Sequence, residues 1–232
     1  MISVCIATYN GEKYLRTQLE SILSQLNNND EVIVSDDGSN DNTFAIIKSF
    51  KDNRIHYYVN DKKHGFVGNF ENALNHAIGD YIFLSDQDDI WLSDKVKTIL
   101  PLFNDYDLIV HDAEIVNGDG ISLNKNYFST LHRGQSFLRN LYKSRFLGCC
   151  MAFKKEVRDA CLPFPDNIVA HDYWIGMFSL LKFKVGFIDD ILLNYRRHGN
   201  NVSPSSEKST YSLFYKLFTK RFILIWNIIK RI

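Results

Sequence analysis

The 232-residue chain has few cysteines, no long apolar run and no excess of charge of either sign. Its four cysteines form neither a CxxC metal pattern nor a dense disulfide framework, which favours a reducing compartment. No window approaches the roughly 18 uninterrupted apolar residues that a membrane-spanning helix needs, and no basic leader precedes the first apolar stretch. We therefore expect neither a transmembrane helix nor export.

Glycine-rich phosphate-binding loops are also missing. The Asn-Gly-Glu-Lys segment at 10–13, after the first apolar run, matches neither G-x-G-x-x-G nor G-x-x-x-x-G-K-[ST]. This absence argues against a dinucleotide-dependent oxidoreductase, a P-loop NTPase and a sugar nucleotidyltransferase. A bound phosphate would need a metal ion and side-chain donors instead.

The charges of the chain cancel because two halves of opposite sign are joined. Residues 1–119 carry 20 acidic and 9 basic residues, whereas residues 120–232 carry 7 acidic and 18 basic residues. The overall balance predicts no nucleic-acid partner. The uneven distribution predicts that one half is built around cations and the other around anions or an anionic surface.

The first part of the chain alternates between short β-branched runs and segments with helical apolar spacing. Such βα alternation predicts an α/β fold, with a mostly parallel central sheet and helices on both faces. Later apolar segments at 108–110, 148–153 and 185–188 extend the sheet, and 118–134 reads as a loop region. The early strands are predicted at 2–7, 31–35, 55–59 and 81–84, and the helices at 14–26, 42–50, 69–78 and 94–103.

Polar residues follow three of the predicted strands at the point where each strand ends. Ligands of parallel sheets bind beyond the carboxyl ends of the strands, so we expect these side chains to share one site. Converging acids repel one another unless a cation or a donor-rich ligand joins them. The residues are Thr8, Tyr9 and Asn10 after the first strand, Asp36 and Asp37 after the second, and Asp86, Asp88 and Asp89 after the fourth.

Asp86 and Asp88 occupy alternate positions, which on an extended segment places both carboxylates on one side. Oxygen ligands of this kind suit Mg²⁺ or Mn²⁺. The alternative is an Asp-rich turn in which Asp89 caps the next helix. For Asp36 and Asp37, an ordinary Asp-Gly-Ser turn is an equally good interpretation.

Two later segments carry further candidates. Asp172 stands in an aromatic setting with Trp174, where an apolar environment would raise its pKa and suit it to act as a general base. Trp174 itself is a candidate substrate contact. The alternative is that Asp172 caps the following helix. Arg196 and His198 suit a diphosphate, and a neutral His198 could also bind the metal; the alternative is a solvated basic loop.

A polar, proline-containing stretch at 203–206 marks the best domain boundary, between a catalytic domain (1–203) and a tail (204–232). Residues 208–232 hold six Lys or Arg and no acids, with aromatic and aliphatic residues close to a helical stripe. A basic amphipathic helix of this kind suits the surface of an anionic membrane. Alternatively, the stripe packs against its own domain or against a second subunit.

The ordered set of motifs resembles the inverting family 2 glycosyltransferases, which have the nucleotide-diphospho-sugar transferase (GT-A) fold, and the resemblance covers about residues 1–203. It rests on Thr-Tyr-Asn-Gly at 8–11, Asp-Asp-Gly-Ser at 36–39, Asp-Gln-Asp-Asp-Ile-Trp at 86–91, His-Asp at 171–172 and His-Gly-Asn-Asn at 198–201. The Asp-Gln-Asp-Asp-Ile-Trp and His-Gly-Asn-Asn motifs most resemble those of rhamnosyltransferase-like members that build bacterial surface polysaccharides. Position 171 departs from the family's usual acidic pair, because it is histidine here.

The resemblance implies that Tyr9 and either Asp36 or Asp37 hold the pyrimidine and ribose, and that Asp172 is the base. Asp86 and Asp88 would serve the metal-diphosphate site. The implied activity is a hexosyltransferase that moves a sugar from dTDP-rhamnose or a UDP-sugar to a lipid-linked O-antigen or capsule glycan. It would work in the cytoplasm at the inner face of the cell membrane. The alternative outside enzymes is a catalytically silent nucleotide-sugar-binding module at the membrane.

Overall fold

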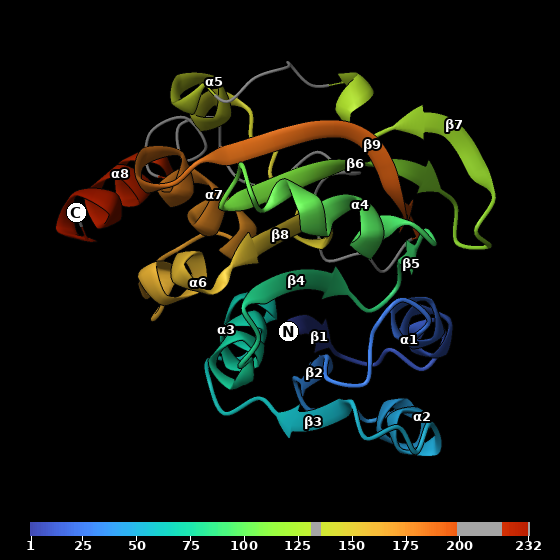
Figure 1. The fold of residues 1–232 in the computed structure, drawn as a ribbon. Coiled ribbons are helices and arrows are strands. Elements are labelled where there is room, and N and C mark those ends of the chain that lie inside the picture. Colours follow the sequence, from blue (N-terminus) through green and yellow to red (C-terminus); the bar gives the residue numbers. More distant parts are fainter. Residues whose placement is uncertain (131–135, 199–219, 232) are drawn as a thin grey trace.

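The computed structural model describes residues 1–130, 136–198 and 220–231. Within these residues one nine-stranded sheet forms the centre, in the order β3-β2-β1-β4-β8-β6-β9-β5, with β7 paired to β6 (Figure 1). The strands are β1 (Ile2–Thr8), β2 (Glu31–Asp36), β3 (Ile55–Val59), β4 (Tyr81–Asp86), β5 (Ile90–Trp91), β6 (Leu108–Val116), β7 (Ser122–Asn126), β8 (Met151–Lys154) and β9 (Val185–Arg196).

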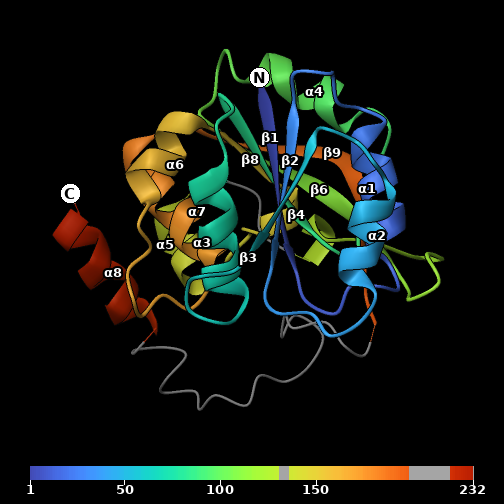
Figure 2. The same cartoon turned by 90° about the horizontal axis from the view of Figure 1, so that it is seen from below.

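Helices cover both faces of the sheet, as the alternating pattern predicts. Figure 2 shows α1, α2 and α4 on one side of the strands and α3, α6 and α7 on the other. Leu15, Leu19 and Ile22 of α1 are fully buried, at the spacing of one helical face. The helices are α1 (Leu15–Leu23), α2 (Thr43–Ser49), α3 (Phe66–His76), α4 (Lys95–Leu102), α5 (Phe137–Tyr142), α6 (Lys155–Cys161), α7 (His171–Lys182) and α8 (Lys220–Arg231).

Strands β1 to β4 are parallel, and their carboxyl ends lie side by side. Thr8 pairs in register with Asp36, and Ala7 pairs with Asp86. The prediction that polar residues following these strands meet at one sheet edge is therefore confirmed. The fully buried β-branched residues of β1 and β2 explain why the sequence forms strands here.

One reversed strand, β8, joins the two halves of the sheet. It runs antiparallel to β4 on one side and to β6 on the other, and β6 is parallel to β9. Strands β6 and β9 consequently point in the same direction as β1 to β4, and the sheet is mostly parallel as expected. The short β5 and β7 run antiparallel to their partners β9 and β6.

Several boundaries differ from the sequence-based expectation. Helix α3 begins at Phe66 rather than at 69, because Gly65 has a φ of 106° and ends the preceding loop directly before the helix. The expected loop at 118–134 contains β7 and a short 3₁₀ turn (Phe128–Thr130). The predicted domain boundary at 203–204 lies outside the described residues.

Helix α8 is the described part of the predicted tail, and it packs against the rest of the chain. Its Leu224 and Ile228 are buried. Packing of the stripe against its own domain, one of the two alternatives, therefore holds for these two residues. Over 1–130, 136–198 and 220–231, no helix combines the length and the apolar character that crossing a membrane requires.

Candidate active site

The loop after β1 is held by one amide side chain, Gln87. Thr8 Oγ1 and the Tyr9 N–H donate to Gln87 Oε1 at 2.6 and 3.0 Å, and Gln87 Nε2 donates to the Tyr9 carbonyl at 3.1 Å. Asn10 accepts a hydrogen bond from the Asn40 N–H at 2.9 Å. The three predicted residues after β1 are thus fixed to the turns after β2 and β4, while the Tyr9 ring stays half exposed.

Asp36 and Asp37 take different places at the end of β2. Asp36 is buried, and its carboxylate accepts from the N–H groups of Gly38 and Ser39 at 2.9 and 2.7 Å and from the Ser39 hydroxyl at 2.7 Å. This is the Asp-Gly-Ser turn that the alternative interpretation describes. The donors to Asp36 all come from its own turn.

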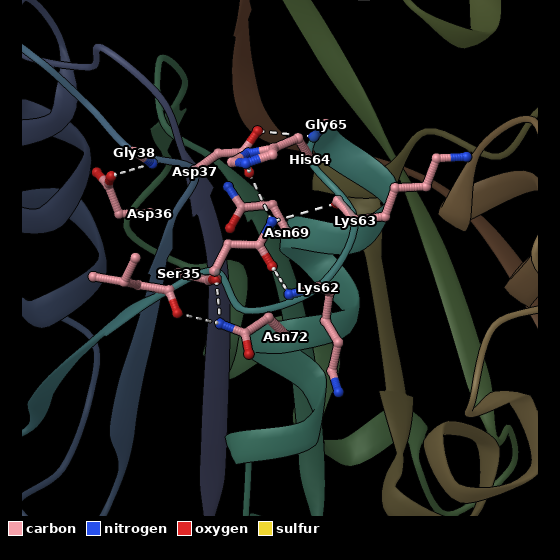
Figure 3. Close-up of polar contacts among 12 residues, drawn as sticks. Ser35, Asp36, Asp37, Gly38, Lys62, Lys63, His64, Gly65, Asn69 and Asn72 are labelled. Atoms are coloured by element: carbon pink, nitrogen blue, oxygen red, sulfur yellow. Dashed lines mark hydrogen bonds and ion pairs between the residues drawn. The ribbon is translucent and has the colours of Figure 1, made fainter.

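The Asp37 carboxylate instead ties this turn to the loop that leads into α3 (Figure 3). It accepts from Asn60 Nδ2 at 2.7 Å and from the Gly65 N–H at 2.8 Å, and it lies 3.1 Å from His64 Nδ1. The His64 side chain is exposed. Asp37 therefore stands at the rim of the sheet edge, whereas Asp36 lies beneath it.

The acidic cluster does not lie on one extended segment. Strand β4 ends at Asp86, and Gln87 and Asp88 form a turn, so the strand alternation expected for Asp86 and Asp88 is wrong. The turn aims the two carboxylates at different partners. Asp88 Oδ2 lies 2.8 Å from His198 Nε2, and Asp86 groups with Asp89 and Cys149, whose ligand atoms lie within 4.8 Å of one another.

Negative charge is concentrated in this cluster. Burial and the neighbouring Asp88 and Asp172 raise the pKa of Asp86 to about 7. Burial, followed by the charges of Asp88 and Asp86, raises the pKa of Asp89 well above its ordinary value. Asp89 Oδ2 has no hydrogen-bond partner within the described part of the chain. Carboxylate oxygens suit a divalent cation, and the imidazole of His198 lies beside Asp88, next in the turn to the Asp86, Asp89 and Cys149 group.

Asp89 and Arg196 connect the acidic turn to the end of β9. Asp89 accepts the Arg196 N–H at 2.9 Å, and α4 begins only after Asp94, so helix capping by Asp89 is wrong. Arg196 Nε donates to the Asp88 carbonyl at 2.7 Å, and its guanidinium lies 4.7 Å from the Tyr14 ring centroid. Because Arg196 is buried, a solvated basic loop does not describe it. The His198 ring stacks on Tyr14, with centroids 5.0 Å apart.

Asp172 lies in the first turn of α7, after the capping position at Ala170, so the capping interpretation is wrong. Its carboxylate accepts from the Gly148 N–H at 3.2 Å and from the Tyr173 N–H at 2.6 Å. Burial raises the pKa of Asp172 to about 6, the environment predicted for a general base. Its charge acts on Asp86, which places the two carboxylates in one electrostatic unit.

His171 and Trp174 are buried and pack against other residues of the fold. His171 stacks on Phe70 with centroids 3.9 Å apart, and burial lowers its pKa to about 3, which keeps the ring neutral. Trp174 has no exposed surface, and its indole N–H donates to the Cys161 carbonyl at 3.1 Å. We correct the expectation of a substrate contact for Trp174, because it is a core residue that anchors α7 to α6.

Some functional positions had no usable sequence signal. Gly148 and Cys149 reach the acids only through the fold, and nothing local marks them. Lys95 is fully buried, donates to the Cys149 carbonyl at 2.8 Å and lies 4.2 Å from the Trp91 ring centroid. Burial lowers the pKa of Lys95 to about 8. Gln87 lies within the acidic motif of the sequence, but its hydrogen bonds to Thr8 and Tyr9 depend on the turn that brings its amide back to β1.

Comparison with known proteins identifies the family of this chain. Residues 3–162 match the model of glycosyl transferase family 2, which is more than half of the chain. The chain belongs to glycosyltransferase family 2. The family resemblance of the sequence motifs is thereby confirmed.

Two bacterial relatives of this family 2 chain have names that state an activity. It is 32% identical over 123 residues to the UDP-Glc:alpha-D-GlcNAc-diphosphoundecaprenol beta-1,3-glucosyltransferase WfgD of Escherichia coli, covering 52% of this chain and 49% of WfgD. It is 29% identical over 215 residues to the dTDP-rhamnosyl transferase RfbG of Shigella flexneri, covering 84% of this chain and 72% of RfbG. The chain therefore spans about half the length of WfgD.

Solved structures in complex with nucleotide sugars share the fold. S. aureus TarS 1-349 in complex with UDP-GlcNAc has a TM-score of 0.74 at 21% identity, over 97% of this chain and 66% of TarS 1-349. The mannosyltransferase PcManGT of Pyrobaculum calidifontis, in complex with GDP-Man and Mn²⁺, has a TM-score of 0.62 at 19% identity, over 86% of this chain and 58% of that protein. These likenesses confirm the predicted α/β fold class.

Proposed function

We propose that this chain is an inverting glycosyltransferase that moves a sugar from a nucleoside-diphosphate donor to a hydroxyl of a saccharide acceptor. The observation that carries the proposal is the junction of the Asp86–Asp89 turn with Asp172 and His198 at the carboxyl edge of the sheet. The charge of Asp172 raises the pKa of Asp86, and His198 contacts Asp88 directly. These contacts support a common location for the proposed metal-diphosphate site and the proposed base.

Asp172 is the proposed base. The N–H groups of Gly148 and Tyr173 hold its two carboxylate oxygens, which fixes the carboxylate before a substrate arrives. A pKa raised to about 6 leaves the group ionised at neutral pH but a stronger base than an exposed aspartate. The base takes the proton of the attacking hydroxyl, and attack opposite the leaving group inverts the anomeric centre. One base suffices, because no covalent intermediate forms.

Asp86, Asp88 and His198 are the proposed holders of Mg²⁺ or Mn²⁺. Support for this site comes from the carboxylates that the turn gathers and from the 2.8 Å contact between Asp88 Oδ2 and His198 Nε2. When bound, such an ion neutralises charge on the departing nucleoside diphosphate. Arg196 fixes the Asp88 turn, because its Nε donates a hydrogen bond to the Asp88 carbonyl. We propose that Arg196 also faces the diphosphate.

The proposed donor site is the sheet edge formed by Thr8, Tyr9, Asn10 and the turn after β2. The half-exposed Tyr9 ring offers a stacking surface for the base, and Asp37 stands at the rim where a ribose hydroxyl would arrive. Asp36 would then shape the turn rather than contact the nucleotide. We propose dTDP-rhamnose or a UDP-sugar as donor, since RfbG and WfgD bear these names.

The proposed acceptor is a lipid-linked oligosaccharide of a bacterial surface glycan such as O-antigen or capsule. The acceptor in the name of WfgD, a diphosphoundecaprenol-linked sugar, supports this choice. An enzyme with such an acceptor works at a membrane surface. We therefore propose peripheral attachment at the inner face of the cell membrane through residues 208–232, of which the structure describes 220–231.

Release of nucleoside diphosphate from a panel of dTDP-, UDP- and GDP-sugars with Mn²⁺ tests the proposal, with and without a lipid-linked saccharide. The Asp172→Asn variant should lose the release, and the exposed Asp190→Asn should keep it as the matched control. Donor binding without release by the wild type would instead support a silent binding module. Release of pyrophosphate would support a sugar nucleotidyltransferase.

A further inference from the structure

Helix α8 is fixed to the domain by an arginine near each end. Arg221 donates from Nε to the Leu141 carbonyl at 2.7 Å and from Nη2 to the Tyr142 carbonyl at 2.9 Å, at the last turn of α5. The last carbonyls of a helix lack helical partners and carry partial negative charge, so a guanidinium suits them. Arg231 makes the same kind of contact at the end of α6, with the carbonyl of Ala160 in its last turn and those of Leu162 and Pro163 just beyond it.

The two arginines set the rotation of α8 about its axis. Leu224 and Ile228, four residues apart, face the domain and are buried. Ile223 and Leu224 line a small cavity together with Ala170 and Tyr173, at the start of α7. Helix α8 therefore packs directly against the turn that carries the proposed base.

The opposite face of α8 is apolar and exposed. The rings of Phe222 and Trp226 stack there, with centroids 6.3 Å apart and planes at 12°. Tyr142 of α5 lies beside Arg221, whose guanidinium is 5.7 Å from its ring centroid, and Leu138 stands one turn earlier on α5. The exposed residues are Leu138 (74%), Tyr142 (76%), Phe222 (68%), Ile225 (37%), Trp226 (50%) and Ile229 (63%). Few monomeric proteins gather so many exposed large apolar side chains.

Basic residues accompany this apolar surface on its two helices. Neither α5 nor α8 contains an aspartate or glutamate. Lys230 Nζ lies 5.0 Å from the Trp226 ring centroid, and Arg139 and Lys143 flank the exposed side chains of α5. Aromatic residues mixed with lysine and arginine match the boundary of an anionic bilayer, where each nearby cation adds to binding.

We propose that the outward faces of α5 and α8 together form a docking surface for an anionic bilayer, with α8 lying in the membrane plane. The proposal deepens the proposed function, because it replaces a loose tail by a rigid two-helix surface. Since the arginines fix α8 to α5 and α6, docking would hold the whole domain in one orientation. Contact of α8 with the start of α7 would keep Asp172 close to the membrane, where a lipid-linked acceptor is found.

Vesicle binding by the full chain, without donor or acceptor, tests the surface. We expect flotation with phosphatidylcholine–phosphatidylglycerol vesicles and little with phosphatidylcholine alone. Of the three tryptophans, Trp91 and Trp174 are buried, so a blue shift of the emission reports entry of Trp226 into lipid. The double variant Phe222→Ser with Trp226→Ser should lower the affinity about tenfold or more. Tyr142→Ser on α5 should lower it by a smaller factor.

Matched controls separate this surface from general stickiness. Phe44→Ser and Ile78→Ser remove exposed apolar side chains far from α8 in the sequence and should leave vesicle binding unchanged. Substitution is preferable to deletion of α8, because deletion would uncover the surface that Leu224 and Ile228 cover. A thermal melt checks that each variant is folded.

Equal binding by the wild type and the Phe222/Trp226 double variant would overturn the proposal. So would a wild type that ignores vesicles but forms a dimer that the double variant cannot form, because the face would then be occupied by a second copy. Since no sugar transfer is measured, either result is independent of the proposed catalytic activity.

Discussion

The two halves of this chain differ in charge, in strand arrangement and in what they bring to the site. Residues 1–119 are acidic and contain the parallel strands β1 to β4, whose ends carry Asp36, Asp37 and the Asp86–Asp89 turn. Residues 120–232 are basic and contain β8 and β9. The site lies where the halves meet, because Asp88 contacts His198 and Asp89 accepts from Arg196. Hydrogen bonds therefore join the two halves at the seam.

The residues of the candidate site are divided between the two halves. The first half supplies most of the carboxylates, but the proposed base and the imidazole come from the second. Reversal of one strand, β8, brings Gly148 and Cys149 beside β4, and α7 then presents Asp172 to Asp86. Variants on each side of the seam should separate the two contributions.

The largest effect is expected from the acidic half. Asp88→Asn should nearly abolish transfer, because it removes a charged oxygen ligand from a site for a hard dication. Nucleoside diphosphate release over a Mn²⁺ titration measures this loss. Full activity of Asp88→Asn in chelator-treated protein would remove the metal from the mechanism.

On the basic side, Asp172→Asn should lower turnover by about 10²-fold or more while donor affinity stays nearly unchanged, since a general base acts on the chemical step. Separate measurement of kcat and of the donor Kd tests this. A variant with full turnover and a weakened fold would identify Asp172 as a purely structural residue.

A change of pH should have a smaller effect on turnover, through the protonation of Asp172. With a pKa of about 6, Asp172 must lose its proton to act, so turnover should fall about fivefold between pH 6 and pH 5. Because the folded pKa lies above the unfolded value, this group's contribution to stability declines as pH rises from about 4 to about 6. Asp172→Asn should lack that decline in a series of thermal melts; an unchanged slope would contradict the raised pKa.

The smallest effects are expected within the acidic half, at the end of β2. Asp37→Asn should raise the donor KM severalfold, because Asp37 stands at the rim. Asp36→Asn should mainly lower stability, by about 1 kcal/mol, through weakened turn hydrogen bonds. Reversed outcomes would assign the ribose contact to Asp36.

Individual helices and strands could be predicted from the sequence, because each depends on residues that are neighbours in the chain. β-branched runs marked β1 and β2, and helical apolar spacing marked α1. The predicted helix over 69–78 lacked its first turn, since only the conformation of Gly65 and its bond to Asp37 show where α3 begins. Trp174 was misread because periodicity cannot tell a core aromatic from one at a site.

The sequence by itself determined the fold class, the sheet edge where polar residues gather and the family, because strand periodicity and motif order are written along the chain. Only the tertiary structure decided that the Asp88 turn faces His198, that Asp36 serves its own turn and that α8 turns Phe222 and Trp226 outward. These facts depend on residues far apart in the chain, whose contacts form when β8 inserts and Arg221 and Arg231 dock on helix ends. No local pattern encodes them.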